Sequence, residues 1–435
     1  MPRIFSKKGD RKVLNAWAFY DWANSVYPLV ISSSVFPIYY GALFIDDLYI
    51  EVFGFNFKNT ALISFLTAFA FVILSFITPL LSGIADYLGN KKTFLKFFCY
   101  LGSISCIGLY WFDLENIYIG LLFYFLALIS FWASLVFYNS YLPDIAYKEQ
   151  QDYISAKGYA MGYIGSVILL IFNLVMVLYP SSFGIDGDGA ELIAMKYSFV
   201  SVGLWWIICS QYTFYHLPNL IEKRKIVKDI IFNGFKELKE VWDEVKEITV
   251  IKKFLIAFFI YSSALQTVLL IATYFGEQEI IWPEGEKTIG LIVSILLIQL
   301  IAVFGAMFTA KLSEKLGNIH TLVILNLFWA ILCVGAYFIT KPLEFYIAAG
   351  LVGLVMGGIQ ALSRSTFSKM IPETNNTTSY FSFYDVSQKV SIVIGMTLFA
   401  FIDQITGSMR NSILVFLFIF LAGAFLLKRI KIKNV

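Results

Sequence analysis

Several charged side chains stand inside long apolar stretches of this chain, and they are the first candidates for chemistry. Asp21 and Arg364 lie in separate stretches, and Asp385 and Lys389 lie one helical turn apart in a third. An ionisable group placed in lipid costs free energy, so it usually binds a ligand or transfers an ion. Asp21 could bind a cationic group or carry a proton, and Lys389 could hold a carboxylate or release Asp385 when a ligand competes for it. The alternative is that these charges form static pairs that join helices.

Neutral polar and aromatic residues accompany these charges and extend the candidate binding set. Asn24 follows Asp21 by about one helical turn, and Gln360 shares a helix face with Arg364. Arg364 has a second interpretation, because a long cationic side chain near a helix end can snorkel to the membrane surface. The further candidate binding residues are Tyr20, Tyr27, Asn139, Tyr384 and Gln388.

The sequence offers no constellation for catalysis or for a bound metal. His216 and His320 stand apart from any cluster of acids or cysteines, and the four cysteines all fall in apolar stretches without a CxxC spacing. No phosphate-binding glycine loop is present, which argues against direct use of ATP. We therefore expect a protein that is not an enzyme and that carries no metal and no cofactor.

The elements that must position these residues are membrane helices. Hydrophobic residues make up 59% of the 435 residues and charged residues only 14%, whereas an ordinary soluble domain carries roughly 25% charge. A helix needs about 20 mostly apolar residues to cross a bilayer. The sequence therefore predicts an all-α membrane protein with twelve transmembrane helices. The predicted spans are 14–44, 60–82, 93–112, 116–139, 156–179, 195–217, 251–275, 288–310, 321–340, 343–370, 379–403 and 408–428.

The distribution of charge predicts the orientation and the domain organisation. Most of the 33 Lys and Arg residues fall on the side of the predicted termini, and the opposite loops hold few of them. The positive-inside rule then places both termini in the cytoplasm. We expect cytoplasmic tails at 1–13 and 429–435, six-helix bundles at 14–217 and 251–428, and a cytoplasmic linker at 218–250.

The linker itself has the pattern of an amphipathic helix. Ile231, Phe235, Leu238, Trp242 and Val245 recur at helical spacing with Lys and Glu between them. Such a helix lies on the membrane surface. It serves either as a tether between the two bundles or as a regulatory or partner-binding element.

The two halves of the chain carry related loop motifs. Asp86-Tyr87-Leu88-Gly89-Asn90 follows the second predicted helix, and Glu314-Lys315-Leu316-Gly317-Asn318 follows the eighth. Leu142-Pro143-Asp144 and Ile371-Pro372-Glu373 repeat at nearly the same separation. An internal duplication of six helices explains both matches. We expect a gating loop in each half, with Glu314 and Gly317 in the second one.

The first of these loops resembles the loop signature of the major facilitator superfamily, G-x-x-x-D-x-x-G-x-K/R-K/R. The matching residues are Gly83, Asp86, Gly89, Lys91 and Lys92. The superfamily often has arginines where this chain has Tyr87 and Asn90, so part of its charge network is missing or rebuilt here. The alternative is an ordinary tight turn with solvated charges.

Further segments are similar to the vacuole-effluxer-like branch of that superfamily, which includes the autophagy-linked amino-acid effluxers and bacterial relatives. These segments are 20–25 (YDWANS), 138–146 (YNSYLPDIA), 358–365 (GIQALSRS) and 383–410. The last segment departs from the branch at Gln388-Lys389, usually Gly-Lys, and at Gly395-Met396, usually Gly-Pro. The resemblance covers most of the chain outside the loops.

The resemblance implies a twelve-helix facilitator fold and export of an amino acid or a similar small polar metabolite. The expected mechanism is alternating access, in which two bundles rock around a central polar cavity, with protons as a candidate coupling ion. The expected partners are a small-molecule substrate and the lipid bilayer, the expected state is a monomer, and no nucleic acid is expected. The alternatives are a facilitative uniporter or channel for a small solute, and a polytopic membrane scaffold without transport.

Overall fold

The computed structural model describes residues 7–44, 49–52, 54–219 and 229–430. Within them, twelve helices are long and apolar enough to cross a membrane, which confirms the predicted number. These helices are Arg11–Leu43, Ala61–Leu88, Lys91–Trp111, Ile117–Ile145, Lys148–Leu178, Ala190–His216, Thr249–Glu279, Lys287–Leu316, Asn318–Phe338, Pro342–Met370, Thr377–Thr406 and Met409–Lys428. The predictions for residues 1–6, 220–228 and 431–435, in the tails and the linker, lie outside the described residues.

The elements follow one another along the chain as two helical halves joined by α9. The first half comprises α1 (Arg11–Asn24), η1 (Tyr27–Val35), α2 (Phe36–Leu43), β1 (Tyr49–Val52), β2 (Phe55–Lys58), α3 (Asn59–Leu88), α4 (Lys91–Gly108), η2 (Leu109–Trp111), α5 (Ile117–Asn139), α6 (Leu142–Ile145), α7 (Lys148–Leu178), η3 (Pro180–Phe183) and α8 (Ala190–His216). The linker helix is α9 (Ile230–Glu247). The second half comprises α10 (Thr249–Glu279), α11 (Lys287–Leu316), α12 (Asn318–Phe338), α13 (Pro342–Met370), α14 (Thr377–Thr406) and α15 (Met409–Lys428).

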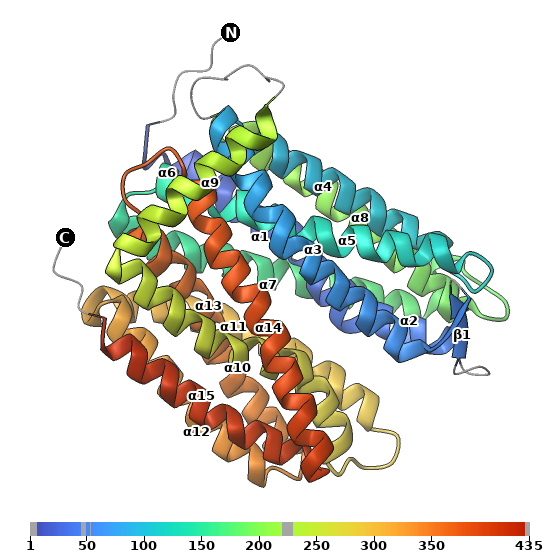
Figure 1. The fold of residues 1–435 in the computed structure, drawn as a ribbon. Coiled ribbons are helices and arrows are strands. Elements are labelled where there is room, and N and C mark those ends of the chain that lie inside the picture. The colour runs from blue at the N-terminus through green and yellow to red at the C-terminus, as the bar shows by residue number, and fades with distance from the viewer. Residues whose placement is uncertain (1–6, 45–48, 53, 220–228, 431–435) are drawn as a thin grey trace.

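Each half packs around its own apolar core. Trp17 and Trp206 are completely buried in the first half, and Trp329 is buried in the second. Figure 1 shows the first half in blue to green and the second in yellow to red, lying side by side. The halves meet where α7 packs against α11 and α13, and where α3 and α5 pack against α14. Residues on these four interfaces decide whether the halves stay together.

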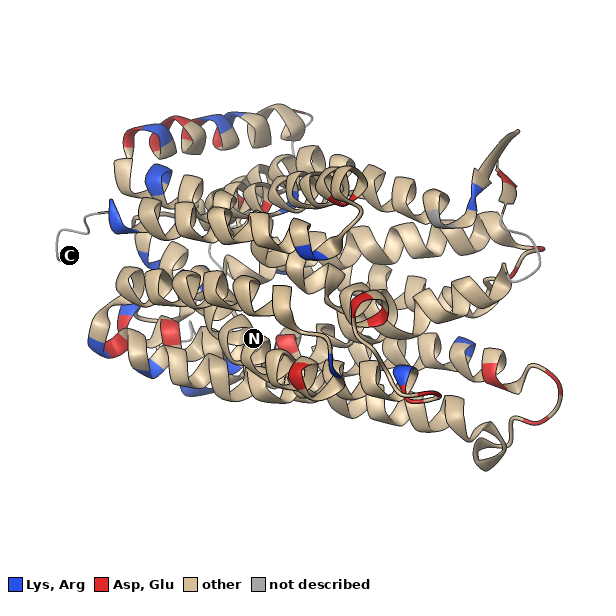
Figure 2. Ribbon diagram, turned by 90° about the horizontal axis from the view of Figure 1, so that it is seen from below, with Lys and Arg blue, Asp and Glu red and all other residues tan. Residues whose placement is uncertain are grey.

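The end of the molecule that carries α9 also gathers the positive charge, and we call it the α9 end. Figure 2 shows Lys and Arg of α9 and of the neighbouring helix ends together at this end. The first helix begins here, where the backbone N–H of Gly9 donates to the carbonyl oxygen of Ile145 at 2.7 Å. The opposite end carries the small hairpin of β1 and β2, in which Tyr49 pairs with Lys58 and Val52 with Phe55. Strands this short have too few residues to show a clear alternation of apolar and polar side chains, so the sequence does not indicate them.

The first membrane helix is not regular along its length. Its middle part, η1, is a π-helical segment with Pro28 at its beginning, and Pro37 stands at the beginning of α2. Proline lacks a backbone N–H and clashes with the preceding turn, so it interrupts the regular helical hydrogen bonding. Isolated π-helical turns are unusual and occur frequently at functional sites. The irregular part begins at Tyr27, between one and two helical turns beyond Asp21.

The linker helix α9 lies across the ends of both halves. Its buried side consists of Gly234, Val241 and Val245, whereas Ile231, Phe235 and Trp242 from the predicted apolar face stay exposed. The segment is helical in the structure, and Val245 of the predicted apolar face is buried against the protein. Gly234 lets the backbone of α9 approach α3 directly at Gly83.

Candidate functional site

Arg364 of α13 joins the second half to three helices of the first half. Its guanidinium group donates to Oδ2 of Asp21 on α1 at 3.1 and 3.2 Å, and to Oδ1 of Asn139 at the end of α5 at 3.2 Å. It also donates to Oγ and to the backbone oxygen of Ser155 on α7, both at 2.9 Å. Only 2% of Arg364 and 5% of Asp21 are exposed. The pair is therefore a buried ion pair between the halves, and Arg364 does not snorkel to the surface.

Aromatic rings surround the same guanidinium group. Its central carbon lies 4.3 Å from the ring centroid of Tyr159, 4.8 Å from that of Trp17 and 5.5 Å from that of Tyr138. A cation over an aromatic face is attracted by the ring quadrupole, more strongly where water is absent. The hydroxyl of Tyr138 also donates to Oδ2 of Asp21 at 2.9 Å. We call the set Trp17, Asp21, Tyr138, Ser155 and Tyr159 the cation cage.

A glycine makes room for this cation cage. A methyl group on Gly158 would overlap Oδ2 of Asp21 and come within 3.1 Å of a terminal nitrogen of Arg364. A side chain at this position would therefore displace the carboxylate of Asp21 from its present place. Gly158 therefore lets the ion pair form directly against the backbone of α7.

Asp86 of the predicted gating loop binds the first turn of α14 in the other half. Its carboxylate accepts from the backbone N–H of Ser379 at 2.6 Å and from that of Thr378 at 3.2 Å. The first N–H groups of a helix lack partners within the helix and carry the positive end of its dipole. A carboxylate at this position therefore satisfies two donors and neutralises the helix end. Gly89, with φ of 62°, ends α3 just beyond this contact.

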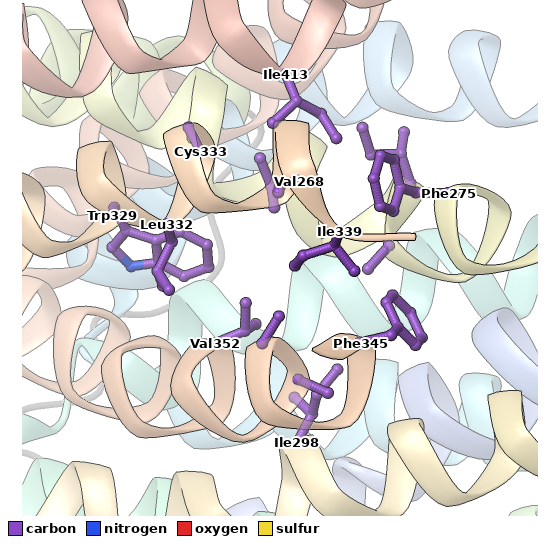
Figure 3. Close-up of a pocket in the computed structure, with 15 residues that line it drawn as sticks. Val268, Phe275, Ile298, Trp329, Leu332, Cys333, Ile339, Phe345, Val352 and Ile413 are labelled. Atoms are coloured by element: carbon purple, nitrogen blue, oxygen red, sulfur yellow. The ribbon is translucent and has the colours of Figure 1, made fainter. Parts of the chain in front are cut away.

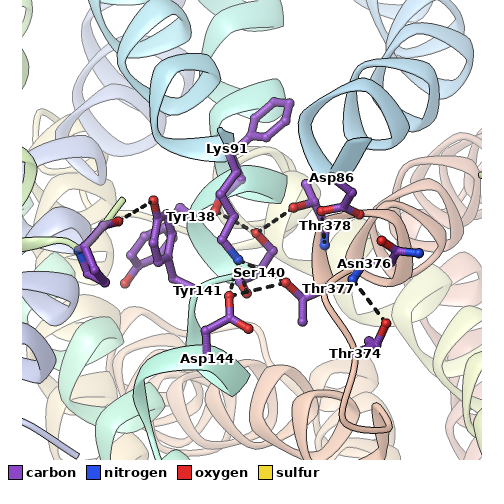
Figure 4. A network of polar contacts seen from close by, with 12 residues as sticks. Asp86, Lys91, Tyr138, Ser140, Tyr141, Asp144, Thr374, Asn376, Thr377 and Thr378 are labelled. Carbon is purple, nitrogen blue, oxygen red and sulfur yellow. Dashed lines mark hydrogen bonds and ion pairs between the residues drawn. The ribbon is translucent and has the colours of Figure 1, made fainter. Parts of the chain in front are cut away.

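Lys91 of the same loop lies at the centre of a second polar group (Figure 4). It forms an ion pair with Asp144, donates to the backbone oxygen of Ser140 at 2.8 Å and to Oγ1 of Thr377 at 2.9 Å, and lies 4.5 Å above the ring of Tyr141. Asp144 belongs to the repeated Leu-Pro-acid motif, so the two motifs of the first half bind each other. Thr377 extends this group into α14 of the second half.

The remaining gating-loop residues have different surroundings in the two halves. Lys92 is buried and donates to the backbone oxygen of Leu217 at 2.6 Å, so it fixes α4 to the end of α8. Glu314 and Gly317 of the second copy are exposed, although Glu314 stands where Asp86 stands in the first. The duplicated sequence therefore does not produce two equal contacts.

A third group between the halves was not found from the sequence. Asp152 of α7 forms an ion pair with Lys369 of α13 at 2.5 Å and accepts from Nδ2 of Asn318 at 2.8 Å and from Oγ of Ser313 at 3.2 Å. The predicted fifth helix began at residue 156, because the segment before it is polar. In the structure α7 begins at Lys148, since its polar side chains are buried against the second half rather than solvated.

Asp385 and Lys389 form the predicted pair within α14, and the pair is deeply buried. Lys389 is completely inaccessible, and its amine lies 3.4 Å from Oγ1 of Thr78 on α3. Lys389 stands about 18 Å along α14 from its first turn, at 1.5 Å per residue. This pair is therefore the charged group between the halves that lies farthest from the α9 end among those described.

The other predicted binding residues do not gather at one place in the structure. Gln360 reaches across the halves and accepts from the hydroxyl of Tyr163 at 2.8 Å, whereas Tyr384 stacks on Phe258 inside the second half. Asn24 is 1% exposed. Gln388 lies half-buried on α14. Tyr20 and Tyr27 contact rings within the first half, as shown by their neighbours Tyr138, Phe214, Phe131 and Trp206.

One cavity lies elsewhere and is apolar (Figure 3). It has a volume of about 70 Å³ and lies inside the second half between α10, α11, α12, α13 and α15. Phe275, Trp329, Ile339, Phe345 and Val352 are among its lining residues. A polar cargo would lose its hydrogen bonds there, so the charged groups between the halves remain the better candidate site.

Solved structures of transporters share this arrangement of helices. FucP, described as a major facilitator superfamily transporter in the outward conformation, matches with a TM-score of 0.70 at 14% identity, over 97% of this chain and all of its own. The human organic anion transporter MFSD10 matches with a TM-score of 0.70 at 12% identity, over 97% of this chain and 100% of its own. The fold is therefore that of the major facilitator superfamily.

Sequence relatives narrow this class, and the chain belongs to the family described as vacuole effluxer Atg22 like, whose model matches residues 9–434. The MFS-type transporter YxiO of Bacillus subtilis is 30% identical over 415 residues, which cover 95% of this chain and 93% of YxiO. Autophagy-related protein 22 of Kluyveromyces lactis is 24% identical over 426 residues, which cover 88% of this chain and 80% of that protein. This chain is accordingly an integral, multi-pass membrane protein of an MFS-type transporter family.

Proposed function

We propose that this chain is a secondary transporter that moves a small polar metabolite across the membrane by alternating access. The regions 14–217 and 251–428 act as two bodies that rock against each other, and 218–250 links them. The α9 end and both termini face the cytoplasm of a bacterial cell, as the positive-inside rule requires. The protein works as a monomer in the inner membrane, and export is the favoured direction.

The observation that supports this proposal best is the concentration of polar contacts between the halves at the α9 end. The pairs Asp21–Arg364 and Asp152–Lys369 and the bond from Asp86 to α14 all join the first half to the second there. Such contacts are specific, yet each consists of a few hydrogen bonds that can be exchanged for others. They describe a carrier closed toward the α9 end, whose other state requires that these contacts break together.

The buried pair of Asp385 and Lys389 is the proposed site of coupling. A charge left alone at this depth is strongly unfavourable, so the two groups ionise or neutralise together. When the pair separates, a proton bound by Asp385 would replace Lys389 as its partner. A cargo carboxylate bound by Lys389 would likewise replace Asp385. Thr78 of α3 lies beside the pair, so this exchange would change a contact between the second half and the first.

An amino acid is the proposed cargo for two reasons. The family description names vacuole effluxers, and the charges between the halves include both a carboxylate and an amine that could face a zwitterion. Purified protein in liposomes should therefore catalyse saturable counterflow of a labelled amino acid from a mixed panel. Lys389→Met should abolish this flux, whereas Lys315→Met, at an exposed position near the α9 end, should leave it unchanged.

The same experiment separates the proposal from its alternatives. A channel would pass label down its gradient without counterflow and without saturation. A scaffold would give no flux above that of empty liposomes. A uniporter would show counterflow that an imposed proton gradient leaves unchanged, whereas proton coupling predicts a response to the gradient that Asp385→Asn removes.

A further inference from the structure

We propose that the cation cage of Trp17, Asp21, Tyr138, Ser155 and Tyr159 binds an organic cationic group of the cargo, an ammonium or guanidinium, whenever Arg364 leaves it. In the closed state Arg364 occupies this site as a tethered competitor. The inference rests on the proposed function, because alternating access is what removes Arg364 from the cage. It adds the chemical class of the ligand that the site accepts, and it identifies Arg364 as the residue that expels this ligand.

The division of these residues between the halves is the first argument. Among the residues that the structure describes, each group that contacts the guanidinium through a hydrogen bond or a ring face belongs to α1, α5 or α7 in the first half. Arg364 alone comes from the second half, on α13. When the halves separate at the α9 end, the cage stays assembled on one body and its present occupant departs with the other.

The chemistry of the empty cage is the second argument. The groups it would present are the carboxylate of Asp21, the hydroxyl and backbone oxygens of Ser155, the side-chain oxygen of Asn139 and three aromatic faces. All of these are hydrogen-bond acceptors or π faces, and the only full charge is negative. Aromatic cages of this kind recognise quaternary ammonium and related cations. An anion or a purely apolar molecule would leave the carboxylate without a cationic partner, with only the hydroxyl of Tyr138 bound to it, which is costly in a buried site.

Competition for one site couples binding to conformation. A ligand shifts an equilibrium only by the difference between its affinities for the two states. A cation in the cage excludes Arg364, so it stabilises the state open at the α9 end. Return of Arg364 excludes the cation in turn and closes this end behind it. The arginine therefore releases the cargo in the direction away from the α9 end, as an exporter requires.

The direct test vacates the cage by mutation. The full-length Arg364→Ala variant in lipid nanodiscs is titrated with guanidinium chloride in the low millimolar range, and its melting temperature is recorded. We expect a saturable rise for guanidinium and none for urea, its neutral isostere, or for sodium chloride at equal ionic strength. The wild type, in which Arg364 competes for the cage, should show a smaller rise at each concentration, and the double variant Asp21→Asn/Arg364→Ala should lose it. A rise that persists in the double variant, or an equal response to urea, would overturn the inference.

A second measurement uses the unmutated chain and does not depend on the folding of the variant. Guanidinium should compete with Arg364 and raise the hydrogen–deuterium exchange of the backbone amides of Thr378 and Ser379, which are bound by Asp86 in the closed state. Urea at the same concentration should not raise it. Unchanged exchange would contradict the competition, whatever the outcome with the variant.

Neither measurement needs transport, so the two proposals can fail separately. If guanidinium binds the vacated cage but liposomes show no flux, the transport proposal fails and the cation site remains. If liposomes show counterflow but neither measurement responds to guanidinium, the transporter remains and the cation cage is only a closing contact.

Discussion

A single carboxylate at the end of α3 holds the first turn of α14, and its position explains why the residue type matters. Asp86 binds two backbone N–H groups of the other half and faces the positive end of a helix dipole. An amide at the same position could still accept one hydrogen bond, but it would carry no charge. The carboxylate is therefore needed for the strength of the contact rather than for its shape.

We expect Asp86→Asn to weaken the closed state by about 1 kcal/mol, the usual contribution of a capping carboxylate. Exchange of the amides of Thr378 and Ser379, measured by mass spectrometry, should rise several-fold. Glu373→Gln, which neutralises an exposed carboxylate at the same end, is the matched control and should have no effect. Equal exchange in both variants would mean that Asp86 does not hold α14.

Variants of Asp385 and Lys389 can distinguish a structural role of this pair from a functional one. Lys389→Met alone leaves a buried carboxylate without a partner, at a cost of about 3–5 kcal/mol. The double variant Asp385→Leu/Lys389→Met removes both charges, so it should recover most of the thermal stability. If the pair couples transport, the double variant should be stable but without flux. Recovery of flux together with stability would show that the pair is only structural.

At the scale of elements, α9 connects parts of both halves. Its Glu237 accepts from Nδ2 of Asn376 at 3.1 Å, its Glu244 accepts from the hydroxyl of Tyr380 at 2.6 Å, and its Trp242 ring lies 5.2 Å from that of Phe383. On the other side its backbone presses against α3. Opening at the α9 end must therefore break one of these two sets of contacts.

The contact between α9 and α3 depends on Gly234. A methyl group at this position would lie 2.5 Å from Cγ1 of Ile84 and 2.9 Å from its backbone nitrogen. Gly234→Ala should therefore lift α9 from α3 and raise amide exchange throughout α9. Gly335→Ala in α12, where a methyl group meets nothing within 4 Å, should be neutral or slightly stabilising. Unchanged exchange in α9 would show that the close approach is not required.

Length and hydropathy were enough to predict the twelve membrane helices, because lipid allows few alternatives to a helix. Apolar residues at helical spacing indicated a helix in the linker, but nothing indicated the hairpin of β1 and β2. The partners of individual charges did not follow. Lys91 and Asp152 stand in polar segments that a sequence shows as solvated. Packing within the first half buries Lys91 against Asp144, and packing of the two halves buries Asp152 against Lys369. Likewise, nothing in the spacing of Trp17 and Tyr159 indicates that they meet at Arg364.

At the scale of the whole molecule, the asymmetry of charge predicts a testable topology. A cysteine introduced at Asn56, in the hairpin at the end opposite α9, should react with a membrane-impermeant maleimide in intact cells. A cysteine introduced at Lys246 in α9 should react only after the membrane is permeabilised. The reverse pattern would place the α9 end outside the cell and would contradict the proposed orientation.

The two copies of the gating loop make different contacts, and this difference has a kinetic consequence. Asp86 binds the first turn of α14, whereas Glu314 is exposed. The internal repeat therefore does not give the two access states equal free energies. Reopening at the α9 end must break the bonds of Asp86, Asp152 and Arg364 in a single event. That event should therefore set the turnover rate, and turnover should rise steeply with temperature until those bonds are removed by mutation.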